Sequence, residues 1–199
     1  EFSVGNYGRA AEDYSRGLRI AKEQGLRERE AALLTNLGIL AVSSGNSGEA
    51  ETRFDDALRL ARIAGDRALL GSILTNLGVI AAQNQQFEKA SDRFEEAVEM
   101  ARSDGNRRTM AYLHINMGAL AHDRGDLDRA EKEFGHALEL ARELGDRRRM
   151  CHALSSLTAI AIARREYDDA ERYAQEGLLH ARTAKVSDSV RSEEHTSEL

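Results

Sequence analysis

The sequence predicts an all-α fold in which antiparallel pairs of helices repeat along the chain. The tripeptide Asn36-Leu37-Gly38 recurs as Asn76-Leu77-Gly78 and as Asn116-Met117-Gly118, 40 residues apart each time. A degenerate copy, Ser156-Leu157-Thr158, lies at the same spacing again. A fixed period of this size is typical of a repeat array, and the composition, rich in Ala, Leu, Glu and Arg and free of Pro, favours helices. We therefore expect an α-solenoid of about nine helices, in which each repeat packs on the next.

Each 40-residue period contains two stretches whose apolar side chains recur every three or four residues. In the second full repeat, Ile73, Leu77 and Ile80 mark the first stretch, and Ala90 and Phe94 mark the second. This spacing indicates helices that each bury one face. The predicted helices cover residues 7–23, 27–43, 47–63, 67–83, 87–103, 107–123, 127–143, 147–163 and 167–183. They form a half repeat at 6–23 and four full repeats at 27–63, 67–103, 107–143 and 147–183.

Glycine followed by a capping residue separates the predicted helices. The glycines between repeats lie one period apart, at Gly25, Gly65, Gly105 and Gly145. Glycine is favoured there because the residue after a helix adopts a left-handed backbone conformation. Asp66, Asn106 and Asp146 follow directly, and each is a good N-cap for the next helix. Inside the repeats, Gly45-Asn46 and Gly125-Asp126 show the same arrangement.

The residues after each Leu-Gly also recur in a fixed order. Ala41, Ala50, Phe54 and Ala57 follow the first copy, and matching residues follow the next two. Gly38 and Ala50 are small where the two helices would cross, and Phe54 would fill the space further along. HEAT and armadillo repeats fit the period on length alone, but the residue pattern points elsewhere.

This order of residues closely resembles the tetratricopeptide repeat (TPR), in a long 40-residue form. The long form is similar to Pins-type adaptors and to bacterial regulators in which such an array follows a signalling ATPase module. The resemblance implies a right-handed TPR solenoid over residues 1–183, whose first helices line a concave groove. It also implies that a peptide or protein segment binds in that groove.

The resemblance implies that Asn36, Asn76 and Asn116 hold the backbone of that segment. Asn in the middle of a helix costs up to about 0.7 kcal/mol relative to Ala, so its recurrence suggests a hydrogen-bonding role. A structural bond to a neighbouring helix is the alternative interpretation. The other candidate groove residues are Thr35, Thr75, Tyr112, His122, Asp123 and His152. The last four change type between repeats, so they either set specificity or are simply solvated.

Composition and charge narrow the range of functions. A net charge of −6 argues against a nucleic-acid surface, and no apolar run approaches the roughly 18 residues of a membrane span. Cys151 is the only cysteine, which excludes an internal disulfide and favours a reducing, cytoplasmic location. We expect neither an enzyme nor a cofactor, because no nucleophile–base pair or phosphate loop is present. The spacing of His114 and His122 matches no metal motif, so we expect no metal site.

Two functions fit this sequence. The first is a protein-interaction scaffold, and the second is a regulatory sensor segment of a larger bacterial signalling ATPase or transcription regulator; neither implies an oligomeric state. Residues 184–190 are expected to form a linker. Residues 191–199 resemble the in-frame translation of a sequencing-library adapter, so we expect them to be disordered and foreign to the natural protein. On that interpretation this chain is a fragment whose natural sequence continues.

Overall fold

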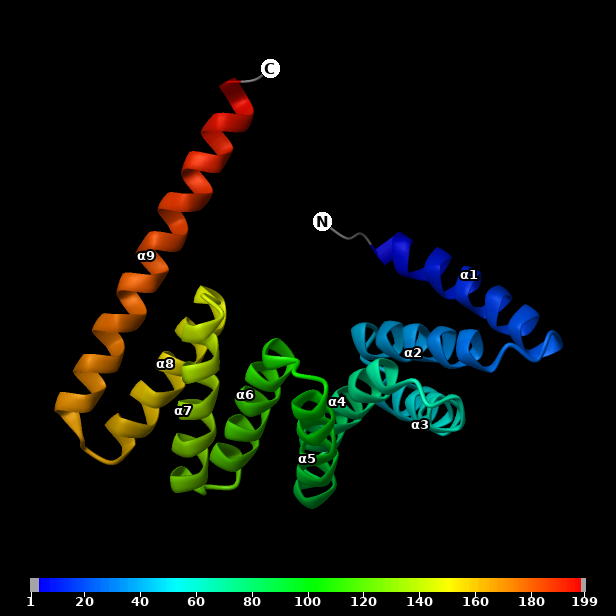
Figure 1. Cartoon of the computed structure of the whole chain (residues 1–199), viewed down its shortest axis with the longest axis horizontal. Helices are drawn as coiled ribbons and strands as arrows, with labels where there is room; N and C mark the ends of the chain where they lie inside the picture. Colours follow the sequence, from blue (N-terminus) through cyan, green and yellow to red (C-terminus); the bar gives the residue numbers. More distant parts are fainter. Residues whose placement is uncertain (1–3, 198–199) are drawn as a thin grey trace. The chain divides into compact units, whose positions relative to one another are not determined.

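A computed structural model describes the backbone of residues 4–197 and the side chains of residues 8–182. All secondary structure in the described residues is helical, so the predicted all-α class is confirmed (Figure 1). In chain order the helices are α1 (Val4–Glu23), α2 (Arg27–Ser43), α3 (Ser47–Ala64), α4 (Arg67–Gln83), α5 (Phe87–Ser103), α6 (Arg107–Asp123), α7 (Leu127–Glu143), α8 (Arg147–Ala163) and α9 (Tyr167–Ser197). Most of these bounds agree with the predicted ones.

The helices form two compact units, one up to Met100 and the other from Ala101 onwards. In the first unit, α1 packs on α2, α2 on α3 and α3 on α4. In the second unit, α6 packs on α7, α7 on α8 and α8 on α9, with α6 also touching α8. Successive helices within a unit run in opposite directions (Figure 1). Each helix therefore packs mainly on its neighbours in sequence, as expected of a repeat array.

A glycine–phenylalanine contact closes the crossing of the two helices in the second full repeat. A Cβ atom added at Gly78 on α4 would lie 2.5 Å from the ring of Phe94 on α5, which is 1% exposed. Gly38 with Phe54 and Gly118 with Phe134 make the same contact. The ring thus lies directly on the glycine, and not further along the helix as the sequence analysis predicts. The missing Cβ is what admits the ring.

The fourth full repeat exchanges the sizes of these two residues. Thr158 on α8 stands at the glycine position, and Ala174 on α9 stands at the phenylalanine position. The Thr158 hydroxyl donates to the Leu154 carbonyl, 2.7 Å away in the same helix, so it needs no partner on α9. Both residues line a cavity of about 400 Å³ between α8 and α9. A larger residue on the first helix therefore accompanies a smaller one on the second.

The predicted helix caps are confirmed. The side-chain oxygen of each capping residue accepts a hydrogen bond from the backbone N–H three residues later. The caps are Asn46, Asp66, Asn106, Asp126 and Asp146. Gly65, between α3 and α4, has the expected left-handed conformation, with φ of 70°. These local signals explain why the helices begin and end where the sequence predicts.

The last helix departs from the prediction. Lys185 stands one period after Gly145, where a helix-ending glycine is expected. Glycine is not indispensable for such a turn, since Gln85 and Arg165 adopt the left-handed conformation elsewhere in the array, but here no turn forms and α9 continues to Ser197. Residues 184–190, which the sequence predicts to be a linker, are therefore helical. So are residues 191–197, which the sequence predicts to be disordered. The side chains of this segment, and residues 198–199, lie outside the described part.

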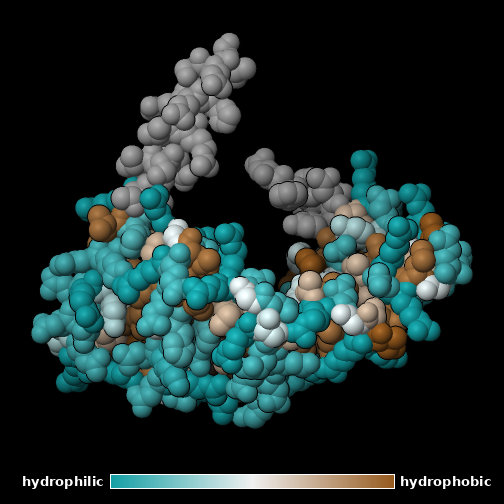
Figure 2. All heavy atoms as spheres, viewed as in Figure 1, coloured by the Kyte–Doolittle hydropathy of each residue, from teal (hydrophilic) through white to brown (hydrophobic). Residues whose placement is uncertain are grey.

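On the face in view, the surface is mostly hydrophilic, and hydrophobic side chains are exposed in small separate groups (Figure 2). Larger exposed apolar side chains include Ile39, Ile63 and Ile162. Among the described residues, no helix combines the length and apolar character that crossing a membrane requires.

Asp146 adds an ion pair to its capping role. Its side chain accepts a hydrogen bond from the backbone N–H of Arg149, 3.1 Å away, and pairs with the Arg149 guanidinium. Burial pushes the pKa of Asp146 up, but the hydrogen bonds and charge of Arg149 outweigh it and lower the pKa below its ordinary value of 3.8. The folded state therefore favours the ionised carboxylate.

Replacing Asp146 with Ala should lower the free energy of unfolding by about 1 kcal/mol at pH 7. The folded pKa lies below the unfolded pKa of about 3.9, so the charge-dependent stability is present above that value. It should be lost as the pH falls through the folded pKa. Urea unfolding of wild type and Asp146→Ala at pH 7 and pH 3 measures this, and the difference should shrink at pH 3. Asp146→Asn keeps a capping oxygen without titrating, so its difference from Asp146→Ala should not change with pH.

Candidate functional site

An exposed stripe runs along the first helix of each full repeat and passes through the recurring asparagine. It consists of the asparagine and the residues four before, three after and seven after it, which share one helix face. On α6 these are Tyr112, Asn116, Ala119 and Asp123. In all four first helices, α2, α4, α6 and α8, the side chains at these positions are exposed or half-buried. We call this set the Asn stripe; in α8 its asparagine is replaced by Ser156.

Two of the stripe asparagines make no bond to a neighbouring helix in the described part of the chain. Asn76 Nδ2 donates to the Ser72 carbonyl, 2.9 Å away in its own helix, and this bond leaves Oδ1 as an acceptor. Asn116 Nδ2 is shielded from solvent and has no hydrogen-bond partner among the described residues. The structural bond considered in the sequence analysis is therefore absent at Asn76 and Asn116. Asn36 is half-buried at the matching position of α2.

In the second unit, α8 places a cation beside Tyr112 of the stripe. The Arg149 guanidinium carbon lies 6.0 Å from the centroid of the Tyr112 ring, and Tyr112 is 41% exposed. Arg149 Nε is shielded from solvent and, among the described residues, has no hydrogen-bond partner. Asn116 follows Tyr112 by one helical turn. Two hydrogen-bond donors without partners, Asn116 Nδ2 and Arg149 Nε, thus lie on residues next to the exposed Tyr112 ring.

The more variable candidates are all exposed. Asp123 and His152 lie on the Asn stripes of α6 and α8, and His122 lies beside the end of the α6 stripe. His122 Nδ1 is 3.7 Å from Asp123 Oδ1, with both side chains more than half exposed. A pair this exposed contributes little to stability, so neither residue is required for packing.

Thr35 and Thr75 do not belong to the stripe, and here the sequence prediction is wrong. Both are buried, and their hydroxyls donate to carbonyls of their own helices, to Ala31 at 2.9 Å and to Gly71 at 2.7 Å. Successive helical residues are about 100° apart around the axis, so the neighbour of an exposed Asn turns into the core. These threonines support packing and are not available to a groove ligand.

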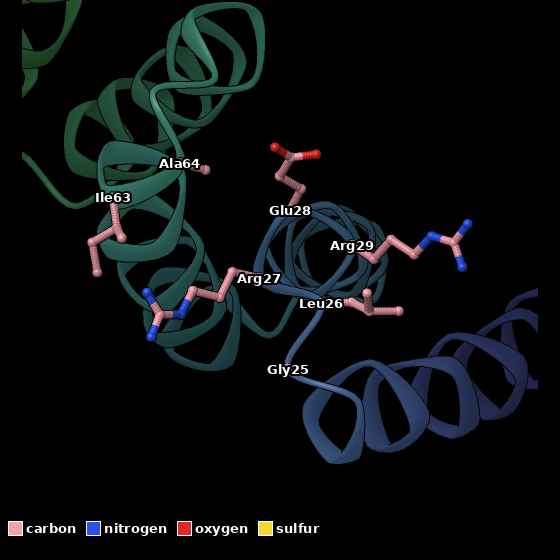
Figure 3. A pocket seen from close by; sticks show the side chains of 7 residues that line it. All are labelled: Gly25, Leu26, Arg27, Glu28, Arg29, Ile63 and Ala64. Carbon is pink, nitrogen blue, oxygen red and sulfur yellow. The ribbon is translucent and has the colours of Figure 1, made fainter.

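A cavity of about 550 Å³ in the first unit lies away from the asparagines. It lies between the start of α2 and the end of α3, and it is lined by Gly25, Leu26, Arg27, Glu28, Arg29, Ile63 and Ala64 (Figure 3). The side chains of Arg27, Glu28 and Arg29 point in different directions from the helix. No set of polar groups converges there, so the cavity is a weaker candidate than the stripe.

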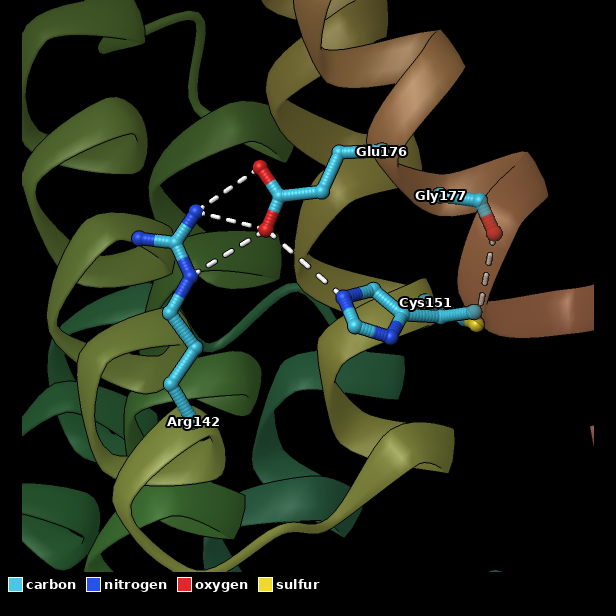
Figure 4. Close-up of polar contacts among 5 residues, drawn as sticks. Arg142, Cys151, Glu176 and Gly177 are labelled. Atoms are coloured by element: carbon cyan, nitrogen blue, oxygen red, sulfur yellow. Dashed lines mark hydrogen bonds and ion pairs between the residues drawn. The ribbon is translucent and has the colours of Figure 1, made fainter. Parts of the chain in front are cut away.

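Charged residues link the second helices of successive repeats within each unit. Arg142 on α7 makes a two-pronged pair with Glu176 on α9, with Nη2 2.7 and 2.8 Å from the two carboxylate oxygens (Figure 4). In the first unit, Arg62 on α3 pairs with Glu96 on α5 at 2.8 Å. Figure 4 also shows Cys151 of α8 against Gly177, with Sγ 3.8 Å from the carbonyl. These contacts tie helices together and need no ligand.

A buried imidazole–carboxylate pair, which the sequence alone does not predict, joins α6 and α7. His114 Nδ1 lies 2.7 Å from Glu133 Oε2, and both residues are 8% exposed. Burial pushes the pKa of Glu133 up, but the hydrogen bond and charge of His114 and the charge of His136 lower it overall. The sequence carries one sign of this pair, because His114 stands where the other repeats have a buried Leu.

Comparison with known proteins finds one family model that matches this chain. The model of the MalT-like TPR region matches residues 1–195. No curated protein matches the chain significantly. Among solved structures, BtubC from P. vanneervenii is 23% identical, with a TM-score of 0.84 over 91% of this chain and 75% of that one.

Two further solved structures share the fold. A Rap protein complexed with Competence and Sporulation Factor is 20% identical, with a TM-score of 0.75 over 91% of this chain. The tetratricopeptide repeat sensor protein of the STAND ATPase class from Pyrococcus horikoshii is 19% identical, with a TM-score of 0.75 over 93% of this chain. This chain spans 51% of the Rap protein and 29% of the STAND protein. At these identities the likeness is one of fold.

Proposed function

The chain belongs to the family of MalT-like TPR regions, and from that membership we propose that it binds a peptide or protein segment on its Asn stripes. Stacked helical repeats present extended surfaces of this kind, which typically bind other molecules. The fold is typically a non-catalytic interaction module. The related Rap protein complexed with Competence and Sporulation Factor supports a binding role for such an array.

The observation that carries this proposal is the state of the asparagine side chains. Asn76 and Asn116 are half-buried in the middle of their stripes, and neither bonds to a neighbouring helix in the described residues. An extended peptide offers alternating N–H and C=O groups, and a carboxamide can both donate to and accept from them. Asn76 Oδ1, which the bond from Nδ2 to Ser72 leaves available, would accept a hydrogen bond from a peptide N–H. Beside Asn116, the Tyr112 ring, which is 41% exposed, would pack against the peptide.

Selection from a random peptide library on the immobilised chain tests this proposal. We expect peptides to be selected for each unit, with Asn76→Ala weakening those bound to the first unit and Asn116→Ala those bound to the second, each about ten-fold, the value of one hydrogen bond. Asn84→Ala, at an exposed asparagine in the turn after α4, is the matched control and should bind as wild type does. Affinities are measured by fluorescence anisotropy, and circular dichroism checks that helicity is unchanged. Failure to select any peptide, or equal affinities for all variants, would contradict the proposal.

A regulatory sensor segment of a larger signalling ATPase or transcription regulator is the second candidate. Two observations favour it: the family match and the likeness to the STAND protein with its tetratricopeptide repeat sensor. In such a protein the lone Cys151 would suit the reducing cytoplasm. Sequencing the gene upstream of residue 1 tests this candidate. A phosphate-binding loop motif in the same reading frame is expected, and a frame that contains only further repeats would contradict it.

A further inference from the structure

Three side chains of types that bind metal ions meet between α6 and α7. His114 comes from α6, and Glu133 and His136 come from α7. One ligand atom from each lies within 4.8 Å of the others, and the rings of His114 and His136 meet edge to face with centroids 5.2 Å apart. His114 and Glu133 are buried, whereas His136 is exposed, so the cluster extends from the core to the surface.

The other repeats act as internal controls for this cluster. At the position of His114 they carry Leu34, Leu74 and Leu154, all no more than 2% exposed. At the position of Glu133 they carry Arg53, Arg93 and Tyr173. At the position of His136 they carry Asp56, Glu96 and Glu176. Packing of the repeat therefore requires none of the three residues, yet all three changes occur in the same repeat; two of them introduce a metal-ligand side chain, and the third replaces a carboxylate with an imidazole.

Having His114 where the other repeats have leucine is unfavourable for folding by itself. It gives up the burial of an apolar side chain, and it brings an imidazole into the core. The carboxylate of Glu133 satisfies one ring nitrogen of His114. A simple buried pair would need only these two residues. Such a pair does not explain why His136 stands where the other repeats carry acidic residues that pair with arginine.

We propose that His114, Glu133 and His136 bind a divalent transition-metal ion, with Zn²⁺ as the preferred ion. Two imidazoles and one carboxylate form a known zinc donor set, which leaves a fourth position for water or another ligand. Glu133 and His136 are three residues apart on α7, so both project from the same helix face, toward His114. The ion would take the place of the proton between His114 and Glu133 and would hold α6 to α7. The Asn stripe on α6 would thereby be fixed relative to its partner helix.

Zinc titration of the purified chain tests this proposal. The full chain is freed of any affinity tag, treated with a chelator, and titrated with ZnCl₂ in a calorimeter. We expect one ion per chain and a rise in melting temperature when Zn²⁺ is added. His114→Leu, which restores the residue of the other repeats, should keep the fold and lose both effects. Glu133→Gln and His136→Ala should weaken binding at least ten-fold.

Controls separate this site from other histidines and from folding defects. His152→Ala removes an exposed histidine outside the cluster and should bind Zn²⁺ as wild type does. If His114→Leu does not fold, His136→Ala provides the same test, because His136 is exposed. Absence of zinc binding by the wild type, or equal binding by the variants and the wild type, would overturn the proposal. The cluster would then be only an imidazole–carboxylate pair with a neighbouring histidine.

Discussion

Truncation of Phe94 to Ala should lower the free energy of unfolding by about 3–5 kcal/mol, the usual loss for a buried phenylalanine. The Phe94 ring is 1% exposed and lies against Gly78, where no side chain exists to move into the vacated space. The neighbouring helix α4 would have to shift toward α5 to close the cavity. Such a shift is only partial in packed cores, so most of the cavity should remain.

Urea unfolding followed by circular dichroism measures this loss. Phe87→Ala, at the start of the same helix, removes an identical ring from a half-buried position and is the matched control. It should cost clearly less than Phe94→Ala. A loss below about 1 kcal/mol at Phe94, or equal losses at both positions, would mean that the ring does not pack into the helix crossing.

Placing Thr at Gly78 should destabilise the chain by about 1–3 kcal/mol or more, through overpacking. Its Cβ would lie 2.5 Å from the buried ring of Phe94, closer than two carbon atoms approach. The fourth full repeat already contains the compensating arrangement, with Thr158 and Ala174 at the two positions. The double variant Gly78→Thr/Phe94→Ala copies that arrangement into the second repeat.

We expect the double variant to be more stable than the two single losses predict, by at least about 1 kcal/mol, because removal of the Phe94 ring relieves the clash with the threonine. The same urea unfolding assay on wild type, both single variants and the double variant gives this coupling energy. Strictly additive losses would contradict the contact between Gly78 and Phe94. They would also show that the exchange in the fourth repeat is not a packing compensation.

The sequence predicts the helix bounds well because local chemistry sets them. A left-handed glycine ends one helix, and a capping side chain such as Asp66 begins the next, so the signals need no tertiary context. The exception is the end of the last helix. Lys185 replaces the expected glycine, and α9 continues past residue 183.

The candidate site is harder to predict from the sequence, because the contacts that a side chain makes depend on how the helices pack. The period places Asn76 in the middle of a first helix, but only the structure shows its bond to Ser72. Thr75 next to it turns into the core, which helical geometry alone suffices to predict. His114 and Glu133 are 19 residues apart on different helices, so their contact requires knowledge of how α6 packs on α7.

The most direct test of the central claim is a nuclear magnetic resonance titration of the ¹⁵N-labelled chain with a selected peptide. The side-chain NH₂ signals of Asn36, Asn76 and Asn116 are assigned by substitution with Ala. We predict that the stripe asparagines of the unit that binds the peptide, Asn36 and Asn76 or else Asn116, shift in proportion to peptide bound. The signals of Asn46, Asn84 and Asn106, which lie at helix ends, should stay in place. Shifts confined to the second helices, with the stripe asparagines unmoved, would contradict the assignment of the binding surface to the Asn stripes.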